Sequence, residues 1–162
     1  MMRIDNWGFS RRDASEILGL AESTIANWQT RYNLFPEAKA GKGYQISFDL
    51  KRLVKLATMK ALVDARIPPE TAAQMLRRQT PYGHILHNRT AEIVFTFDGA
   101  TWVASDNPDA LCSISIRIWA ILDALWPRFC KAVLSDPRDI ASDVLARGLT
   151  EFREKLEELR PE

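Results

Sequence analysis

Polar side chains that can read nucleic-acid bases gather in a short stretch near the N-terminus. They are Ser23, Thr24, Asn27 and Arg31, which supply two hydroxyls, an amide and a guanidinium. On the exposed side of a helix, the amide of Asn27 can pair bidentately with adenine, and Arg31, one turn later, can reach a guanine or a phosphate. The stretch is therefore a candidate for contacts with base edges in the major groove of DNA.

Two short helices with a tight turn between them must position these side chains. Ser10 begins the first helix, because Asp13 stands three residues later in the capping arrangement, and Gly19 ends it with a positive φ. The second helix spans about residues 21–32, and its apolar stripe lies opposite the polar side chains. That stripe consists of Ile25, Trp28 and Tyr32, which we expect in the core. These proportions predict a helix-turn-helix, whose second helix enters the major groove.

Basic residues flank this motif on both sides. Arg11 and Arg12 begin the first helix, where positive side chains and free N–H groups can both hold a phosphate; a merely solvated helix start is the alternative. After the second helix, Pro36 and the Gly-Lys-Gly stretch at 41–43 favour a small β-hairpin, that is, a wing. The candidate DNA contacts from the wing are Lys39, Lys42, Tyr44 and Gln45. The alternative is that the wing lysines contact nothing.

Beyond the wing the pattern stays helical up to about residue 80. Residues 47–65 predict a long helix capped by Ser47, and residues 71–78 predict a short one. We therefore place a winged helix-turn-helix domain in residues 1–80.

From residue 81 onward the pattern changes to strands. Runs of β-forming residues at 91–97 and 101–105 flank Asp98-Gly99, which signals a hairpin. Residues 113–118 alternate apolar and polar side chains, and they predict either a third strand or the start of the helix that follows.

Two helices are expected to close the chain. Residues 119–134 are helical in pattern although Pro127 interrupts them, and Ser135-Asp136-Pro137 predicts the start of the second helix. The apolar residues of that helix have heptad spacing and are Leu145, Leu149, Phe152, Leu156 and Leu159. This stripe predicts a dimer seam, with folding back on its own domain as the alternative.

The fold class expected for the whole chain is mainly α (α+β). A winged helix-turn-helix in residues 1–80 precedes a small antiparallel β-hairpin or sheet and C-terminal helices in residues 81–162. We expect this second part to serve dimerisation or to bind a protein partner.

Composition narrows the class of protein. The 162 residues carry a net charge of +1, but residues 1–80 hold 13 Lys/Arg against 8 Asp/Glu, a net +5, and the rest hold 9 against 13, a net −4. Such asymmetry is typical of a basic nucleic-acid module joined to an acidic partner domain. No apolar run reaches the length of a membrane span, and the N-terminus is too polar for a secretory signal.

The sequence indicates neither catalysis nor metal binding. Cys112 and Cys130 are too few for a closed thiolate site, and His84 and His87, at helical spacing, have no cysteine cluster beside them. No phosphate-binding loop, nucleophile elbow or His-Glu-x-x-His motif is present. We therefore expect neither an enzyme nor a metal site.

The second helix and the segment after it resemble a known family. The run from Thr24 to Leu34 reads Thr-Ile-Ala-Asn-Trp-Gln-Thr-Arg-Tyr-Asn-Leu, and a spacer with Pro and Lys leads to Gly43-Tyr44. This pattern is similar to the winged helix-turn-helix of the MerR-like regulators, over about residues 9–77. The resemblance implies a bacterial, cytoplasmic transcription regulator that binds double-stranded DNA as a homodimer.

Three positions depart from that family. Ala26 and Gln45 stand where the family has arginine, and Ser47 stands where it has tyrosine. Because those side chains usually serve the DNA backbone, we expect a shallower salt dependence and weak non-specific binding. The most similar branch often carries a cobalamin domain, for which the remaining roughly 80 residues are too few, so no cofactor is expected.

Two other functions fit the same pattern. An excisionase-like DNA-architecture protein of a phage or mobile element uses this winged fold to bend DNA at several adjacent sites. A protein-interaction module on a winged-helix scaffold is the third hypothesis, and the missing arginines at positions 26 and 45 leave it open.

Overall fold

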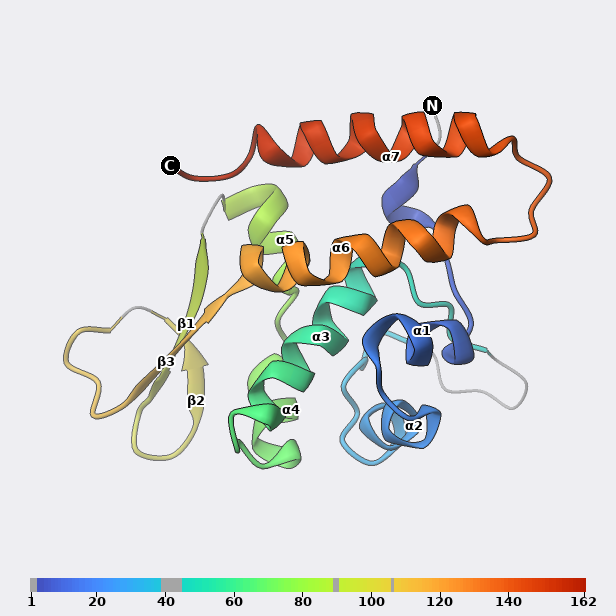
Figure 1. Ribbon diagram of the computed structural model, residues 1–162. Helices are drawn as coiled ribbons and strands as arrows, with labels where there is room; N and C mark the ends of the chain where they lie inside the picture. Colours follow the sequence, from blue (N-terminus) through green and yellow to red (C-terminus); the bar gives the residue numbers. More distant parts are fainter. Residues whose placement is uncertain (1–2, 39–44, 89–90, 106) are drawn as a thin grey trace.

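A computed structural model describes residues 3–38, 45–88, 91–105 and 107–162. Helices dominate the molecule, and a sheet of three short strands lies at one side of it (Figure 1). In chain order the elements are η1 (Ile4–Asn6), α1 (Arg11–Leu18), α2 (Glu22–Thr30), α3 (Leu50–Asp64), α4 (Pro69–Leu76), α5 (Pro81–Gly83), η2 (His84–Asn88), β1 (Glu92–Phe97), β2 (Trp102–Ala104), β3 (Ser113–Arg117), α6 (Ile118–Leu134) and α7 (Ser142–Glu157). The mainly α, α+β fold class is confirmed.

Both ends of α1 follow the sequence signals. The Ser10 hydroxyl accepts a hydrogen bond from the Asp13 N–H at 3.1 Å, and the Asp13 carboxylate accepts one from the Ser10 N–H at 3.2 Å, so the predicted capping box is present. Gly19 follows the helix with a φ of +63°. Because a side chain is strained in this left-handed region, the tight turn between α1 and α2 depends on this glycine.

The start of α3 differs from the prediction. Asp49 caps the helix in place of Ser47, because the Asp49 carboxylate accepts a hydrogen bond from the Arg52 N–H at 3.0 Å. Phe48, the residue before this cap, pairs its backbone with Phe9 in an antiparallel bridge. The bridge keeps the chain extended past Ser47 and moves the helix start by two residues.

The start of α7 is also later than predicted. Ser135-Asp136-Pro137 does not open a helix, and α7 begins only at Ser142. The Asp136 carboxylate instead accepts hydrogen bonds from Trp7 Nε1 at 3.0 Å and from the Arg138 N–H at 3.1 Å. These contacts hold the segment in a loop, so the proline does not occupy a first helical position.

The sheet is antiparallel, with β1 in the middle and β2 and β3 on either side. The hairpin turn forms where the sequence places it, because Asp98 accepts hydrogen bonds from two backbone N–H groups of the turn and Gly99 has a φ of +100°. Strand β3 ends at Arg117 and α6 begins at Ile118. The segment predicted as either strand or helix start is thus a strand that leads directly into the helix.

One hydrophobic core joins the two halves of the chain. Helix α6 packs against α1 and α3, and the ring of Phe9 meets the ring of Phe129 on α6 edge-on, with 5.8 Å between centroids. In Figure 1, α6 crosses above the helix-turn-helix. The residues on either side of the proposed boundary near residue 80 therefore share one core. The boundary stays a prediction about which part of the chain carries which function.

The apolar stripe of α7 packs within its own chain, which corrects the expectation of a dimer seam. Its residues belong to the core or pack against it, and they are Leu145, Leu149, Phe152, Leu156 and Leu159. Leu145 and Leu156 are each only 2% exposed, and the ring of Phe152 stacks on Trp126 of α6 with 6.0 Å between centroids. Figure 1 shows α7 running alongside α6. The alternative, a stripe folded back on its own domain, is what the chain adopts.

Candidate nucleic-acid interface

Helix α2 and the residue after it present a polar row opposite a buried face. Ser23, Asn27 and Arg31 are exposed and follow one another at intervals of four residues, which places them on one side of the helix. On the other side Ile25 and Trp28 are buried, at 0% and 4% exposure. The side chains that the sequence singled out for base contacts therefore face solvent together.

Neighbouring residues tie this row to the rest of the motif. Arg11 Nε on α1 donates a hydrogen bond to Gln29 Oε1 on α2 at 3.2 Å. The Arg31 guanidinium lies 5.5 Å from the centroid of the half-buried Tyr32 ring, within the range of a cation–π contact. Thr24, the remaining predicted base contact, is half-buried beside the row.

The two arginines at the start of α1 are exposed, as a phosphate contact requires. Arg12 Nε lies 3.6 Å from Glu16 Oε1, one turn further along the same helix. Such an exposed pair contributes at most about 1 kcal/mol, so an incoming phosphate can displace Glu16 at small cost. The capping box is formed by Ser10 and Asp13, and the side chains of Arg11 and Arg12 take no part in its hydrogen bonds.

The wing falls largely outside the described residues. Lys39, Lys42 and Tyr44 lie there, and their predicted contacts stay predictions; Gln45 is described and exposed. Arg52 braces the two ends of this segment. Its Nη1 donates to the Ser47 carbonyl at 2.6 Å, and its Nε lies 3.9 Å from a Glu37 carboxylate oxygen.

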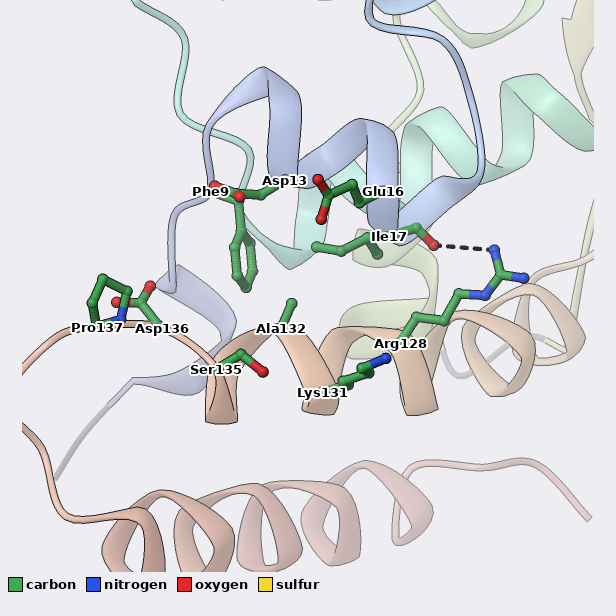
Figure 2. Close-up of a pocket in the computed structure, with 10 residues that line it drawn as sticks. All are labelled: Phe9, Asp13, Glu16, Ile17, Arg128, Lys131, Ala132, Ser135, Asp136 and Pro137. Carbon is green, nitrogen blue, oxygen red and sulfur yellow. Dashed lines mark hydrogen bonds between the residues drawn. The ribbon is translucent and has the colours of Figure 1, made fainter.

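The C-terminal half contacts α1 directly. A cavity of about 470 Å³ lies between α1 and the C-terminal part of α6 (Figure 2). The carboxylates of Asp13 and Glu16 line one wall, and Arg128 and Lys131 line the other. Arg128 Nη1 donates to the Ile17 carbonyl at 3.4 Å, which connects the last turn of α1 to α6.

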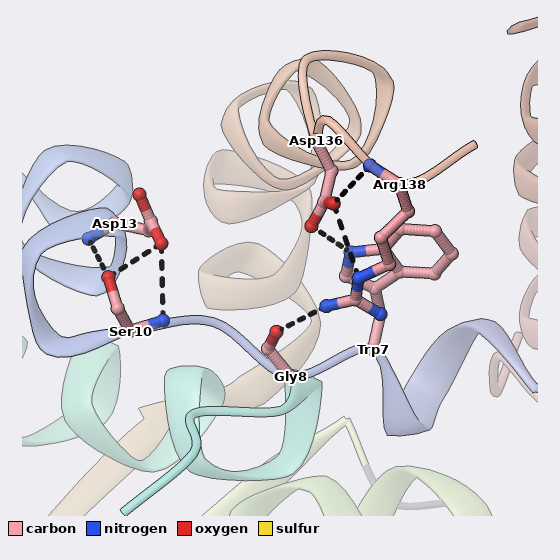
Figure 3. A network of polar contacts seen from close by, with 6 residues as sticks. All are labelled: Trp7, Gly8, Ser10, Asp13, Asp136 and Arg138. Atoms are coloured by element: carbon pink, nitrogen blue, oxygen red, sulfur yellow. Dashed lines mark hydrogen bonds and ion pairs between the residues drawn. The ribbon is translucent and has the colours of Figure 1, made fainter. Parts of the chain in front are cut away.

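A second connection joins the loop after α6 to the segment before α1 (Figure 3). Trp7 donates its indole N–H to Asp136, and the Arg138 guanidinium lies over the Trp7 ring, 4.2 Å from its centroid. Arg138 Nη2 also donates to the Gly8 carbonyl at 2.8 Å. These contacts set where the chain enters α1, and hence how the helix-turn-helix sits on α6.

The cysteines and histidines form no ligand cluster among the residues that the structure describes. Burial raises the pKa of the Cys130 thiol and lowers the pKa of His84, while Cys112 is exposed. In the same described ranges, no helix has both the length and the apolar character needed to cross a membrane.

Sequence reasoning missed the residues that brace the motif from a distance. Arg77, after α4, donates from Nη2 to the Tyr32 carbonyl at 3.0 Å, and the buried Lys55 donates to the Arg77 carbonyl at 3.1 Å. Gln29, which accepts the hydrogen bond from Arg11, lies inside the helix-turn-helix motif, and the sequence pattern assigns it no role. The only sequence signal for Gln29 is its polar side chain on the edge of the second helix. No sequence signal indicates the partners of Arg77 and Lys55.

Residues 9–79 match the family model described as MerR HTH family regulatory protein. Over these residues the chain is thus similar to a MerR-type helix-turn-helix domain, and the small sheet and the C-terminal helices follow it. This match supports a DNA-binding transcription regulator. The comparison with curated proteins returned no match.

Proposed function

We propose that this protein is a sequence-specific transcription regulator of bacterial type that reads the major groove of DNA with α2. The observation that carries the proposal is the exposed row of Ser23, Asn27 and Arg31 opposite the buried Ile25 and Trp28. A recognition helix needs this arrangement, because its inner face must pack on the domain while its outer face offers donors and acceptors to base edges. The match of residues 9–79 to a regulatory family supports it.

The contacts divide by role. Asn27 and Arg31 read bases, with Ser23 and Thr24 beside them near the start of the helix. Phosphates on one flank are held by Arg11 and Arg12, which Gln29 and the capping box position. On the other flank we assign contacts with the adjacent groove to the wing residues, which are Lys39, Lys42, Tyr44 and Gln45. The dependence of affinity on salt is shallow, because Ala26 and Gln45 contribute no charge.

The active form is a homodimer that works in the cytoplasm on two half-sites. One short recognition helix brings only three or four side chains to bases, and two copies on a palindromic site double that number. Because the α7 stripe is buried within one chain, the dimer forms through another surface of residues 81–162. This half also provides room for a protein partner.

Base recognition is tested by electrophoretic mobility shift on the operator selected from a random DNA pool. Asn27→Ala and Arg31→Ala should each weaken binding about ten-fold or more, the size of one lost bidentate contact. Arg147→Ala is the control for charge, because Arg147 is exposed on α7, far along the chain from the motif. Unchanged affinity in both α2 variants would refute this recognition face.

The same selection separates the two other functions. A single palindromic site, with a dimer mass measured in solution, fits the regulator. Repeated and phased sites fit the excisionase-like protein that bends DNA. If the full-length chain binds no duplex even at low salt, the winged-helix scaffold serves protein interaction instead.

A further inference from the structure

A basic pocket lies beside the helix-turn-helix, away from the polar row of α2. The first turns of α3, the end of α4 and the turn after Leu34 enclose a volume of about 360 Å³. Five cationic side chains line it, and they are Lys51, Arg52, Lys55, Arg77 and Arg78. The carboxylate of Glu37 is the one acidic group among the lining residues.

The positive charge of this pocket is largely uncompensated. Among the described residues, Arg52 forms the ion pair with Glu37, and their closest atoms are 3.9 Å apart. Lys51 and Arg78 are exposed and form no ion pair with any of the described residues. Five cationic side chains thus share a small volume with one carboxylate, that of Glu37, which interacts with Arg52 and also with Lys55, and concave walls concentrate the resulting positive field.

One buried group in the pocket lacks the hydrogen-bond partner that buried polar groups normally have, and a second is a buried charge whose hydrogen-bond acceptor is a carbonyl oxygen and not a carboxylate. Arg77 Nε is shielded from solvent and makes no hydrogen bond with the described residues. Lys55 is only 6% exposed, and it donates to the Arg77 carbonyl while its ammonium lies 5.5 Å from the Phe35 ring. An anion in the pocket would offset the cost of burying these charges.

We propose that this pocket binds a phosphate group. A tetrahedral oxyanion offers several acceptors, and it suits a site with guanidinium forks at Arg77 and Arg78 and ammonium groups at Lys51 and Lys55. The volume lies near the lower end of the range for small-molecule sites, which fits a compact group. Burial lowers the pKa of Lys55 to about 8, and a bound anion would raise this pKa again.

The phosphate has two possible sources, a small phosphorylated molecule or the backbone of bound DNA. Arg77 also donates to the Tyr32 carbonyl, directly after the recognition helix, so the pocket borders the proposed DNA-reading motif without including it. The first source is independent of the proposed function, and the second rests on it.

The test uses the full-length protein and a double variant, Lys51→Gln with Arg78→Gln. Both side chains are exposed and unpaired among the described residues, so their loss leaves the core intact. The matched control is Lys131→Gln with Arg147→Gln, which removes the same two charges from exposed sites outside the pocket. One arm measures thermal stabilisation by inorganic phosphate against potassium chloride of equal ionic strength. The other measures the salt dependence of affinity for duplex DNA.

The two sources give different results. If the ligand is a free phosphate group, phosphate stabilises the wild type and the control, and the double variant needs about ten-fold more phosphate for the same shift. If the ligand is the DNA backbone, the slope of log affinity against log salt falls by about 1.8 in the double variant and by less in the control.

A phosphate response in a protein that binds no DNA would uphold the pocket and refute the proposed function. The pocket proposal is overturned by two results together: phosphate stabilises neither the wild type nor the variants, and the double variant has the same salt slope for DNA binding as the control. If the wild type binds no DNA, the absence of stabilisation by phosphate overturns it alone.

Discussion

Trp7 and Asp136 are hydrogen-bonded across 129 positions of the chain, with 3.0 Å between the indole nitrogen and the carboxylate oxygen. The bond joins the segment that enters α1 to the loop that follows α6. Trp7 is 4% exposed, and the Arg138 guanidinium lies over its ring. The helix-turn-helix is therefore connected to the C-terminal half by a polar contact in addition to the shared core.

Removing this hydrogen bond should lower the free energy of unfolding. Trp7→Phe keeps an aromatic ring and removes the indole N–H, which leaves the partly buried Asp136 carboxylate without one donor. We expect a loss of about 1–3 kcal/mol, measured by urea denaturation. Trp102→Phe is the control, since Trp102 makes no hydrogen bond through its side chain to the described residues. A loss no larger than that of the control would show that the bond contributes nothing.

Two glycine-to-alanine changes should have opposite effects on stability. Gly19→Ala places a side chain at a φ of +63°, with its Cβ 3.3 Å from Arg128 Nη1, and should cost roughly 1–2 kcal/mol. Gly148→Ala lies inside α7 and borders a cavity, so it should raise the free energy of unfolding by roughly 0.5–1 kcal/mol. Thermal or urea unfolding of both variants checks the signs, and a stabilising Gly19→Ala would contradict the left-handed turn.

Leu149→Ala distinguishes a core residue from a seam residue. Leu149 is 4% exposed in one chain, so its truncation should cost about 2–5 kcal/mol whatever the protein concentration. Val144→Ala is the control, because Val144 is 49% exposed on the same helix, and it should change stability by less than about 0.5 kcal/mol. A Leu149→Ala loss that grows on dilution would instead place this side chain between two chains.

Lys55 should make stability depend on alkaline pH. Burial lowers its pKa from 10.5 to about 8, while Glu37 raises and Lys51 further lowers it. Between these pKa values the unfolded chain binds more protons than the folded one, so stability rises with pH. The penalty of the buried charge is present below pH 8 and is relieved as the pH approaches 10.5.

The measurement compares urea unfolding of the wild type and Lys55→Met at pH 7 and pH 10. The wild type should gain about 1–3 kcal/mol relative to the variant over this range. Because other titrating groups are common to both proteins, they cancel in the difference. Parallel pH profiles would show that Lys55 titrates in the folded state as it does in the unfolded chain.

Local features could be predicted from the sequence, and features that depend on distant partners could not. The Ser10–Asp13 capping box, the turn at Gly19 and the Asp98-Gly99 hairpin involve neighbours within a few residues, and all three are present. Asp136 looked like a helix start for the same local reason. Its carboxylate is instead engaged by Trp7, from the other end of the chain.

The stripe of α7 shows a second limit. Heptad spacing indicates which side of a helix is apolar, but that side can pack against a partner chain or against the chain's own core. In this structure it packs against the chain's own core, where Phe152 stacks on Trp126. The basic pocket shows a third limit. Lys51 and Lys55 share one side of α3 by spacing alone, but only the fold brings Arg77 and Arg78 to them.

The direct junction of β3 and α6 makes the sheet a continuation of the helix that packs on the helix-turn-helix. No connecting residue separates Arg117 from Ile118, so the end of β3 and the first turn of α6 are placed together. Helix α6 in turn contacts α1 and α3, and Arg128 holds the last turn of α1. The sheet is thus connected to the last turn of α1 through α6, which is continuous with β3.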